Sequence, residues 1–246
     1  MRYVIWVLIC AFVFSSCGRN NRTQRDGTPP PNSVIQNSTP APISPSSFVG
    51  ANKLERDSSG VVSLLQGTNL SRTVEKHPHY QRLVENRSFG EMAIDFVQFF
   101  KIPFQLEDPK SELKVTRVQE DDLGFHQVRL AQNYKSVQVL NSEIIVHFDR
   151  GNHVYLVQGQ YIRTPSEMDL KPKMTLNAVI KAITDHGGLA LVSTNADPVI
   201  LPLNDGPPKL VYQLKSRESL TKQYILLIDA NNGTVIRKVP TIYTAD

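Results

Sequence analysis

Residues 126–139 read HQVRLAQNYKSVQV, and this stretch decides the fold. Apolar and polar residues alternate along it, and turn-forming residues occupy 133–136, which together are typical of a β-hairpin. Working outward, runs rich in β-branched and aromatic residues follow at 144–148 and 154–157, and turn residues at 141–142 separate the first of them from the hairpin. We therefore predict an antiparallel meander with strands at 125–130, 137–140, 144–148 and 154–157.

A helix is expected before this meander. Ser88 and Glu91 have the S-x-x-E spacing of a capping box, and Pro103 marks the stop. Between them apolar residues recur at helical spacing: Met92, Ala93, Phe96, Val97, Phe99 and Phe100. Because one helix can cover one face of an antiparallel sheet, this part should form an α+β unit. Upstream of it the sequence indicates only a strand at 61–65 and a turn at 77–79.

A second unit of the same kind is expected after a polar connector at 164–173. A helix is predicted at 175–186, with Gly187-Gly188 as its stop. Strands are predicted at 199–201, 210–214, 224–228 and 234–236, with a turn at 229–233. The strand 224–228 is apolar on both faces and should be central. The fold class predicted is α+β, with two small units, each an antiparallel β-sheet covered by one helix, after a disordered N-terminal tether.

The first residues indicate export. Arg2 precedes an apolar run from Tyr3 to Phe14 that is too short to span a bilayer as a helix, which needs roughly 20 apolar residues. Residues 14–17, Phe-Ser-Ser-Cys, resemble the lipobox of bacterial lipoproteins, so Cys17 should be lipidated after removal of signal peptide 1–16. Because Gly18 follows the cysteine, and not Asp, we expect lipid anchoring in the bacterial cell envelope, at the outer membrane.

A tether is expected at 17–47. It carries few residues able to enter a core and is rich in proline, serine and asparagine, so it cannot bury enough apolar surface to offset the entropy of ordering it. The six prolines within it are Pro29, Pro30, Pro31, Pro40, Pro42 and Pro45. Proline-rich chain is partly extended, so this segment should space the folded part from a membrane surface.

The composition excludes several classes of protein. The chain has 246 residues, 27 Lys plus Arg against 23 Asp plus Glu, and a net charge of +4 that is too small and too dispersed to indicate nucleic acid as a partner. Its two cysteines, Cys10 and Cys17, both precede the folded part, so neither a disulfide framework nor a cysteine zinc site is expected there.

The hairpin stretch resembles the central pattern of the fungalysin/thermolysin propeptide (FTP) domain, R-x-x-Q-x-Y-x-G-V-x-V. The matching residues are Arg129, Gln132, Tyr134, Val137 and Val139. Ser136 stands where the family has a turn glycine, so this turn should either differ or hold a serine in a costly conformation. The resemblance implies an FTP-like domain at 48–164.

The second unit resembles a PepSY domain. The resemblance rests on the predicted helix, on Tyr212 in an L-x-Y strand, and on a D-A-x-x-G hairpin with Asp229 and Gly233. It implies a PepSY-like domain at 170–240, followed by a C-terminal tail at 241–246. In both resemblances the matching residues are expected to serve the fold.

The sequence carries none of the common catalytic motifs. The sequence has no H-E-x-x-H, G-x-S-x-G or G-x-x-x-x-G-K-S/T. His77 and His79 could ligate a metal but have no evident third ligand, and His126 and His147 could face each other across the sheet. Glu120-Asp121-Asp122 is more typical of a solvated loop than of an ion site. We therefore expect no catalytic residue, no metal and no cofactor.

In proteases of this family, propeptide and PepSY domains precede the zinc-protease domain, help it fold and block its active cleft. The resemblance therefore implies a stand-alone, membrane-anchored, propeptide-like binding protein, not an enzyme, that inhibits a secreted thermolysin-like metalloprotease in trans or assists its folding. Two alternatives stay open. The chain is the N-terminal propeptide part of a truncated metalloprotease precursor, or an envelope structural or interaction protein with no protease partner.

Overall fold

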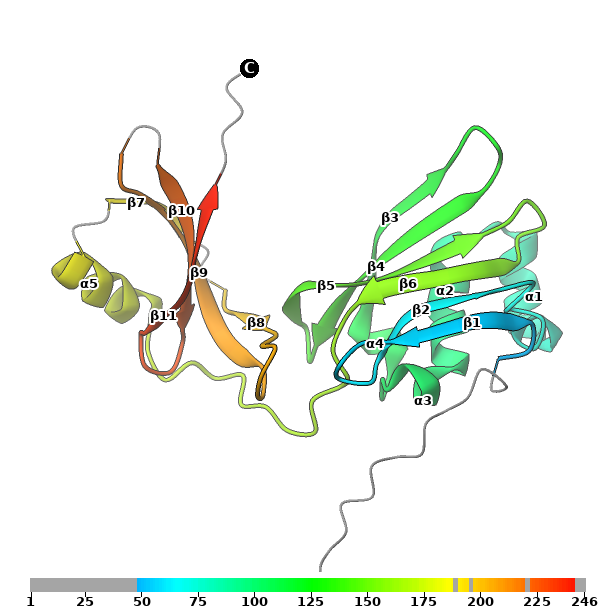
Figure 1. Ribbon diagram of the computed structural model, residues 1–246, viewed down its shortest axis with the longest axis horizontal. Helices are drawn as coiled ribbons and strands as arrows, with labels where there is room; N and C mark the ends of the chain where they lie inside the picture. Colours follow the sequence, from blue (N-terminus) through cyan, green and yellow to red (C-terminus); the bar gives the residue numbers. More distant parts are fainter. Residues whose placement is uncertain (1–47, 188–189, 195–196, 220–221, 242–246) are drawn as a thin grey trace, which may run out of the picture. The chain divides into compact units, whose positions relative to one another are not determined.

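The meander around residues 126–139 is present in the computed structural model, which describes residues 48–187, 190–194, 197–219 and 222–241 (Figure 1). The first sheet consists of β1 (Ala51–Arg56), β2 (Val62–Gly67), β3 (Leu113–Glu120), β4 (His126–Tyr134), β5 (Val137–Phe148) and β6 (Val154–Gln160). Every ladder in it is antiparallel, and the strands lie in the order β1-β2-β6-β5-β4-β3. Alternation along β4 is regular, with every second residue from His126 to Tyr134 buried.

Helical segments cover one face of this sheet. They are the 3-10 helix η2 (Val74–Lys76), α1 (Pro78–Glu85), α2 (Phe89–Phe99), α3 (Lys101–Phe104) and α4 (Pro109–Glu112). Their buried side chains, such as Tyr80, Met92 and Phe96, share one core with Leu130 and Phe148 of the sheet. In Figure 1, α1 and α2 accordingly lie behind β1, β2 and β6.

Several details of the first unit differ from the sequence-based prediction. The helix α2 begins after Ser88 as predicted, but the Ser88 side chain makes no capping hydrogen bond. Pro103 does not stop the helical region, because α3 continues through it. The predicted turn at 77–79 is instead the start of α1, with Pro78 in the first turn, where its missing N–H costs nothing.

The predicted turn at 141–142 is also wrong, because β5 runs through it as one strand. Asn141 has a left-handed backbone (φ 53°), and the register of β4 with β5 shifts there, so that Gln132 alone faces residues 139–142. Asparagine tolerates this conformation better than most residues. What resembled a turn is therefore an irregularity inside a long strand.

Aspartates close three hairpins of the first sheet in the same way. Asp57 accepts the backbone N–H groups of Ser59 and Val61, and Asp121 accepts those of Leu123 and Phe125. Asp149 does the same for two backbone N–H groups of the β5–β6 turn. A side chain that imitates a backbone acceptor in this way is the reason that aspartate favours turns.

The second sheet contains β7 (Ala190–Thr194), β8 (Val199–Leu201), β9 (Lys209–Arg217), β10 (Gln223–Asp229) and β11 (Val235–Thr241), and its helix is α5 (Leu176–Gly187). Strand β10 pairs with both β9 and β11, so the predicted central position of 224–228 is confirmed. Val179 and Ile183 of α5 pack in one core with Leu214 and Leu226. The other face of the sheet has a small core of its own, which includes Val211 and Leu227.

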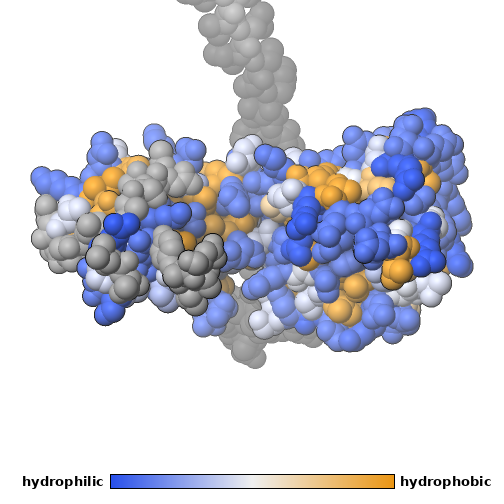
Figure 2. Space-filling view, turned by 90° about the horizontal axis from the view of Figure 1, so that it is seen from above, coloured by the Kyte–Doolittle hydropathy of each residue, from blue (hydrophilic) through white to orange (hydrophobic). Residues whose placement is uncertain are grey.

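The fold is α+β, as the sequence predicted. The two larger hydrophobic cores are compatible with two units, although β5 and β8 also form a parallel pair at Val139 and Ile200. Large exposed apolar side chains are dispersed over several elements: Val49, Phe99, Ile102, Val118, Leu123, Val235 and Val239. Figure 2 shows hydrophobic patches interrupting a mostly hydrophilic surface on the face viewed.

Candidate functional site

Gln132 has the most specific contacts among the residues of the FTP-like pattern. Its side chain is fully buried, its amide nitrogen donates to the Ile162 carbonyl at 2.7 Å, and its amide oxygen accepts from the Ile162 N–H at 3.0 Å. The β5–β6 ladder does not reach Ile162, since its last pair is Glu143 with Gln160. The Gln132 side chain therefore pairs with both backbone groups of Ile162, as a neighbouring strand would. It does so at the irregularity of β5, where the backbone of β5 does not pair with Ile162.

The other residues of the pattern lie on both faces of the hairpin. Arg129 forms an ion pair with Glu143 of the adjacent strand at 2.7 Å, on the face away from the helices. Tyr134 and Val139 are buried in the core shared with α5, and Val137 packs against it. The hairpin thus contributes apolar side chains to the second core as well as strands to the first sheet.

The turn between β4 and β5 consists of two residues with positive φ. Lys135 has a φ of 47° and Ser136 a φ of 68°. Two left-handed residues in succession are the geometry of a type I′ turn, whose twist matches that of antiparallel strands. The turn therefore keeps its geometry although serine stands in the glycine position, as one of the two outcomes anticipated from the sequence.

The residues of the PepSY-like pattern converge on Met174, just before α5. The Tyr212 hydroxyl donates to the Met174 carbonyl at 3.1 Å, and the Met174 N–H donates to the Ala230 carbonyl at 3.0 Å. Gly233 has a φ of 74°, and a Cβ there would lie 3.2 Å from the Met174 sulfur. Asp229 is buried and accepts the Lys209 ammonium at 3.0 Å.

Both patterns therefore hold the same segment of chain, residues 162–174, which contains the polar stretch predicted at 164–173 and is called the connector from here on. Gln132 fixes its first residue, and Thr164 adds a hydrogen bond from its N–H to the Gln105 carbonyl and one from its hydroxyl to Glu112 at 2.6 Å. Tyr212 and Ala230 fix its last residue. Residues far apart in the sequence thus determine where this connector leaves the first core and enters the second.

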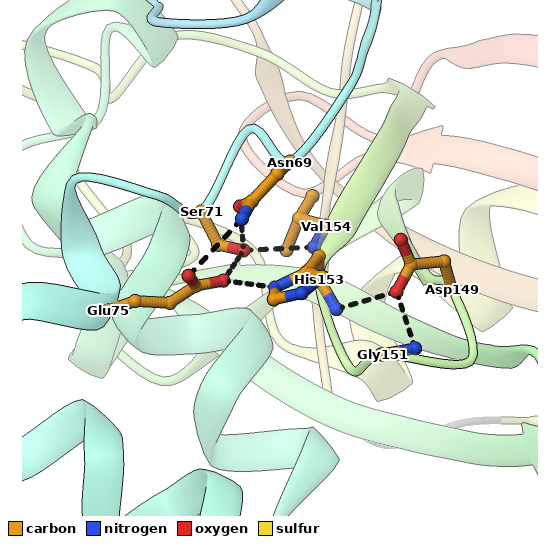
Figure 3. A network of polar contacts seen from close by, with 7 residues as sticks. All are labelled: Asn69, Ser71, Glu75, Asp149, Gly151, His153 and Val154. Carbon is orange, nitrogen blue, oxygen red and sulfur yellow. Dashed lines mark hydrogen bonds and ion pairs between the residues drawn. The ribbon is translucent and has the colours of Figure 1, made fainter.

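A polar network that the sequence did not indicate lies beside the β5–β6 turn (Figure 3). Glu75 accepts the Ser71 hydroxyl at 2.6 Å and contacts His153 Nδ1 at 2.7 Å, both through the same oxygen. Asn69 donates to the other oxygen of Glu75 at 3.3 Å, and the Val154 N–H donates to Ser71 at 3.0 Å. No spacing in the sequence reveals this network, because Glu75 and His153 are separated by four helices, α1 to α4, and three strands, β3 to β5.

The network determines the protonation of Glu75. Burial is the largest single influence and raises the pKa of Glu75, but the hydrogen bonds from Ser71, His153 and Asn69, with the charge of His153, outweigh it. The pKa of Glu75 therefore lies below its ordinary value of 4.5. The carboxylate is charged at neutral pH and can accept all three hydrogen bonds.

The network is not arranged for nucleophilic catalysis. In a hydrolase triad the histidine accepts the serine proton, whereas Ser71 donates to the carboxylate and is fully buried. Glu75, Gln81 and His153 also line a shallow hollow at the surface. The arrangement joins the loop after β2, η2 and the start of β6, and its chemistry is that of a structural polar cluster.

The histidines considered from the sequence are brought to different places. His126 faces the helices, where it stacks on Phe89 at 3.7 Å between ring centroids, while His147 lies on the other face of the sheet, opposite Gln127. They therefore do not face each other. Burial, and next the charge of Arg129, lower the pKa of His147.

His79 contacts Asp95 at 3.1 Å, and Asp95 also binds Lys110 at 2.9 Å. Among the described residues no group of three His, Cys, Asp or Glu side chains is placed to hold a metal ion. Within the same ranges no helix combines the length and the apolar character needed to cross a membrane. The predicted lipidation at Cys17, the predicted signal peptide and tether, and residues 242–246 lie outside the described residues.

The comparisons with known proteins identify the first of these patterns. Residues 111–161 match the Fungalysin/Thermolysin Propeptide Motif. This range contains β3 to β6 and the motif residues from Arg129 to Val139. The chain thus carries a propeptide motif, and the resemblance to the propeptide region of thermolysin-type proteases is confirmed.

Curated relatives include bacillolysins. The chain is 27% identical to the bacillolysin of Bacillus subtilis (strain 168) over 143 residues, which are 53% of this chain and 27% of that protein. It is 26% identical to the bacillolysin of Bacillus amyloliquefaciens over 184 residues, which are 69% of this chain and 34% of that protein. The chain therefore spans about a third or less of the length of these relatives.

A solved structure, the Bacillus megaterium YpeB C-terminal domain, is 10% identical, with a TM-score of 0.35 over 64% of this chain and 65% of that one. A TM-score this low identifies no shared fold. The PepSY resemblance of 170–240 therefore stays a prediction.

Proposed function

We propose that this chain is a membrane-anchored, propeptide-like binding protein that acts in trans on a secreted zinc metalloprotease of the thermolysin type, as its inhibitor or folding assistant. The observation that carries the proposal is the propeptide motif at 111–161, on a chain that also matches bacillolysins. The motif residues serve the fold, since Gln132 and Tyr212 fix the connector, and the proposal assigns them no part in binding.

The proposal includes the domain arrangement and the location. An FTP-like domain at 48–164 and a PepSY-like domain at 170–240 follow a tether at 17–47, and lipid on Cys17 holds the chain in the bacterial envelope, at the outer membrane. Residues 14–17 resemble a lipobox and follow one basic residue and an apolar run, which supports the anchor. An anchored binding protein would meet a protease as it is secreted.

An inhibition assay tests the proposed function. Detergent-solubilised full-length protein is added to thermolysin-type metalloproteases purified from the same organism, and peptide hydrolysis is followed. We expect the rate to fall with increasing protein concentration. Refolding of the denatured proteases with and without the protein separates a folding assistant from an inhibitor. Neither inhibition, nor binding, nor improved refolding at high micromolar concentration would refute both roles.

A second candidate is favoured by one observation, the coverage of 27 to 34% of the bacillolysin sequences. A match confined to part of a relative is also what a propeptide acting in cis would give. Sequencing the gene beyond codon 246 decides between the two. An H-E-x-x-H motif in frame supports action in cis, and a stop codon with no such motif downstream supports action in trans.

A further inference from the structure

The first sheet has one face that no helix of the described chain covers. The core residues Leu65, Val128 and Val146 point toward the helices. Side chains alternate along a strand, so the residues next to these in β2, β4 and β5 point to the opposite face. The ladders place six of these in one row across the sheet: Arg117, Arg129, Ile145, Gln158, Leu64 and Glu55. We name the surface centred on this row the open face.

The open face has apolar residues near its centre, on either side of Gln158, and charged residues at its edges. Ile145 is only 8% exposed although no helix covers it, and the half-buried Leu64 lies two strands away in the same row. In the adjacent row Leu156, also half-buried, lies opposite His147. An apolar centre inside a polar rim is the usual anatomy of a protein–protein interface.

The charges of the open face are unevenly satisfied. Glu55 pairs with Lys53 at 2.8 Å, and Glu143 pairs with Arg129 at 2.7 Å. Arg117 makes no ion pair within the described residues, and it lies directly opposite Arg129. Like charges directly opposite each other in adjacent strands are destabilising. Glu143 already balances the charge of Arg129, so Arg117 is the cation of this row that a carboxylate supplied by a partner would pair with.

We propose that the open face is the surface that docks the protease partner, with Arg117 against carboxylates of an acidic patch and the centre around Ile145 against apolar surface. This inference rests on the proposed function and names the surface that performs it. The partner chemistry follows from the charges, because the carboxylates of this face are already paired while Arg117, on the edge strand β3, is not.

The test is the substitution Arg117→Glu in the detergent-solubilised full-length protein. The new carboxylate lies opposite Arg129, so the repulsion becomes an attraction and the variant should fold at least as well as the wild type. We expect its affinity for the thermolysin-type metalloproteases of the same organism to fall by about tenfold or more, with a weaker dependence on salt. Arg82→Glu in α1, which is the same charge change on the helical side, should alter the affinity by less than about twofold.

The outcomes distinguish the two proposals. If the wild type binds and Arg117→Glu binds equally well, or Arg82→Glu is as damaging, the open face is not the docking surface while the proposed function stands. If the wild type binds none of these proteases, the proposed function fails, and the docking proposal fails with it. A vesicle assay uses the Cys17→Ser background, in which no lipid anchor contributes. Loss of binding to anionic phosphatidylglycerol vesicles on adding Arg117→Glu, with unchanged protease binding, would assign the face to a membrane and overturn the docking proposal.

Discussion

Gln132 uses an amide side chain in the place of a missing stretch of strand. Replacing it with Leu keeps the volume but takes from the N–H and the carbonyl of the half-buried Ile162 the partner that the fully buried Gln132 supplies. We expect Gln132→Leu to lower the free energy of unfolding by about 3 kcal/mol, measured by urea denaturation. The neighbouring Asn133→Ala is the control, because Asn133 is half-buried and has only a long contact of 3.5 Å. Equal losses in both variants would contradict this role of Gln132.

Ser136 holds a conformation that glycine adopts without steric cost. Its φ of 68° places its Cβ close to the following carbonyl, an arrangement that costs about 1 kcal/mol or more. We expect Ser136→Gly to stabilise the protein by about 1 kcal/mol in the same denaturation experiment, since relief of strain exceeds the added freedom of the unfolded chain. Gln138→Gly, in β5, should instead destabilise it. Destabilisation by Ser136→Gly would show that the serine side chain makes a useful contact.

Glu75 should make the stability dependent on acid. Because its pKa is lower in the folded state than its ordinary 4.5, the unfolded chain binds the proton more tightly. The stabilisation is therefore fully present above pH 4.5 and is lost as the pH falls through the folded pKa. We expect the wild type to lose more stability than Glu75→Gln between pH 5 and pH 3, measured by urea denaturation at each pH, since glutamine does not titrate.

His147 provides an internal comparison. Its pKa is lowered in the folded state, so protonation destabilises the fold. Stability should therefore begin to fall as the pH drops below the ordinary pKa of 6.5, a higher window than that of Glu75. His147→Gln should remove pH dependence in that higher window and leave the window of Glu75 unchanged. If Glu75→Gln changed the stability only in the pH range just below 6.5, Glu75 would not be the group that titrates between pH 5 and pH 3.

At the scale of elements, periodicity revealed what depends on local sequence. The alternation of β4, the apolar stripe of α2 and the apolar β10 were all predicted. The prediction failed where tertiary contacts override a local signal. Residues 141–142 resemble a turn, but β5 pairs with β4 on both sides of them, at Gln138 and at Glu143, and stays one strand. Strand β3 was missed because its exposed residues carry little apolar alternation.

The candidate sites, too, could be predicted only as far as they depend on local sequence. Pattern residues such as Gln132 could be named from the resemblance, but their common target, the connector, requires contacts across 30 or more residues. The Glu75 network joins residues 78 positions apart and has no signature in the sequence. Polar clusters of this kind depend on the geometry of several elements at once, which a pattern along one chain does not contain.

The connector should respond when one of its fixed ends is released. Tyr212→Phe removes the hydrogen bond to the Met174 carbonyl while keeping the ring in the core. We expect a loss of about 1 kcal/mol and faster cleavage between 162 and 174 in limited proteolysis. Tyr155→Phe, in β6, is the matched control and should change neither. Unchanged proteolysis of Tyr212→Phe would show that Ala230 alone holds this end.

At the scale of the whole molecule, anchoring is separable from folding. The lipobox-like residues 14–17 precede every described element, so replacing Cys17 should not disturb either core. We expect Cys17→Ser to move the protein from the membrane fraction to the soluble fraction with an unchanged unfolding midpoint, checked by fractionation and denaturation. A variant that stayed in the membrane fraction would contradict lipid anchoring through this residue.

The pairing of β2 with β6 has a consequence for how the chain is made. Strand β6 comes after β3, β4 and β5 in the sequence, yet it lies between β2 and β5 in the sheet. While the chain is being synthesised, the β2 edge of the β1–β2 hairpin therefore stays unpaired until β6, which ends at residue 160, has been made. Long-range pairing of this kind slows folding and exposes strand edges, so the nascent chain should depend on chaperones until the meander closes.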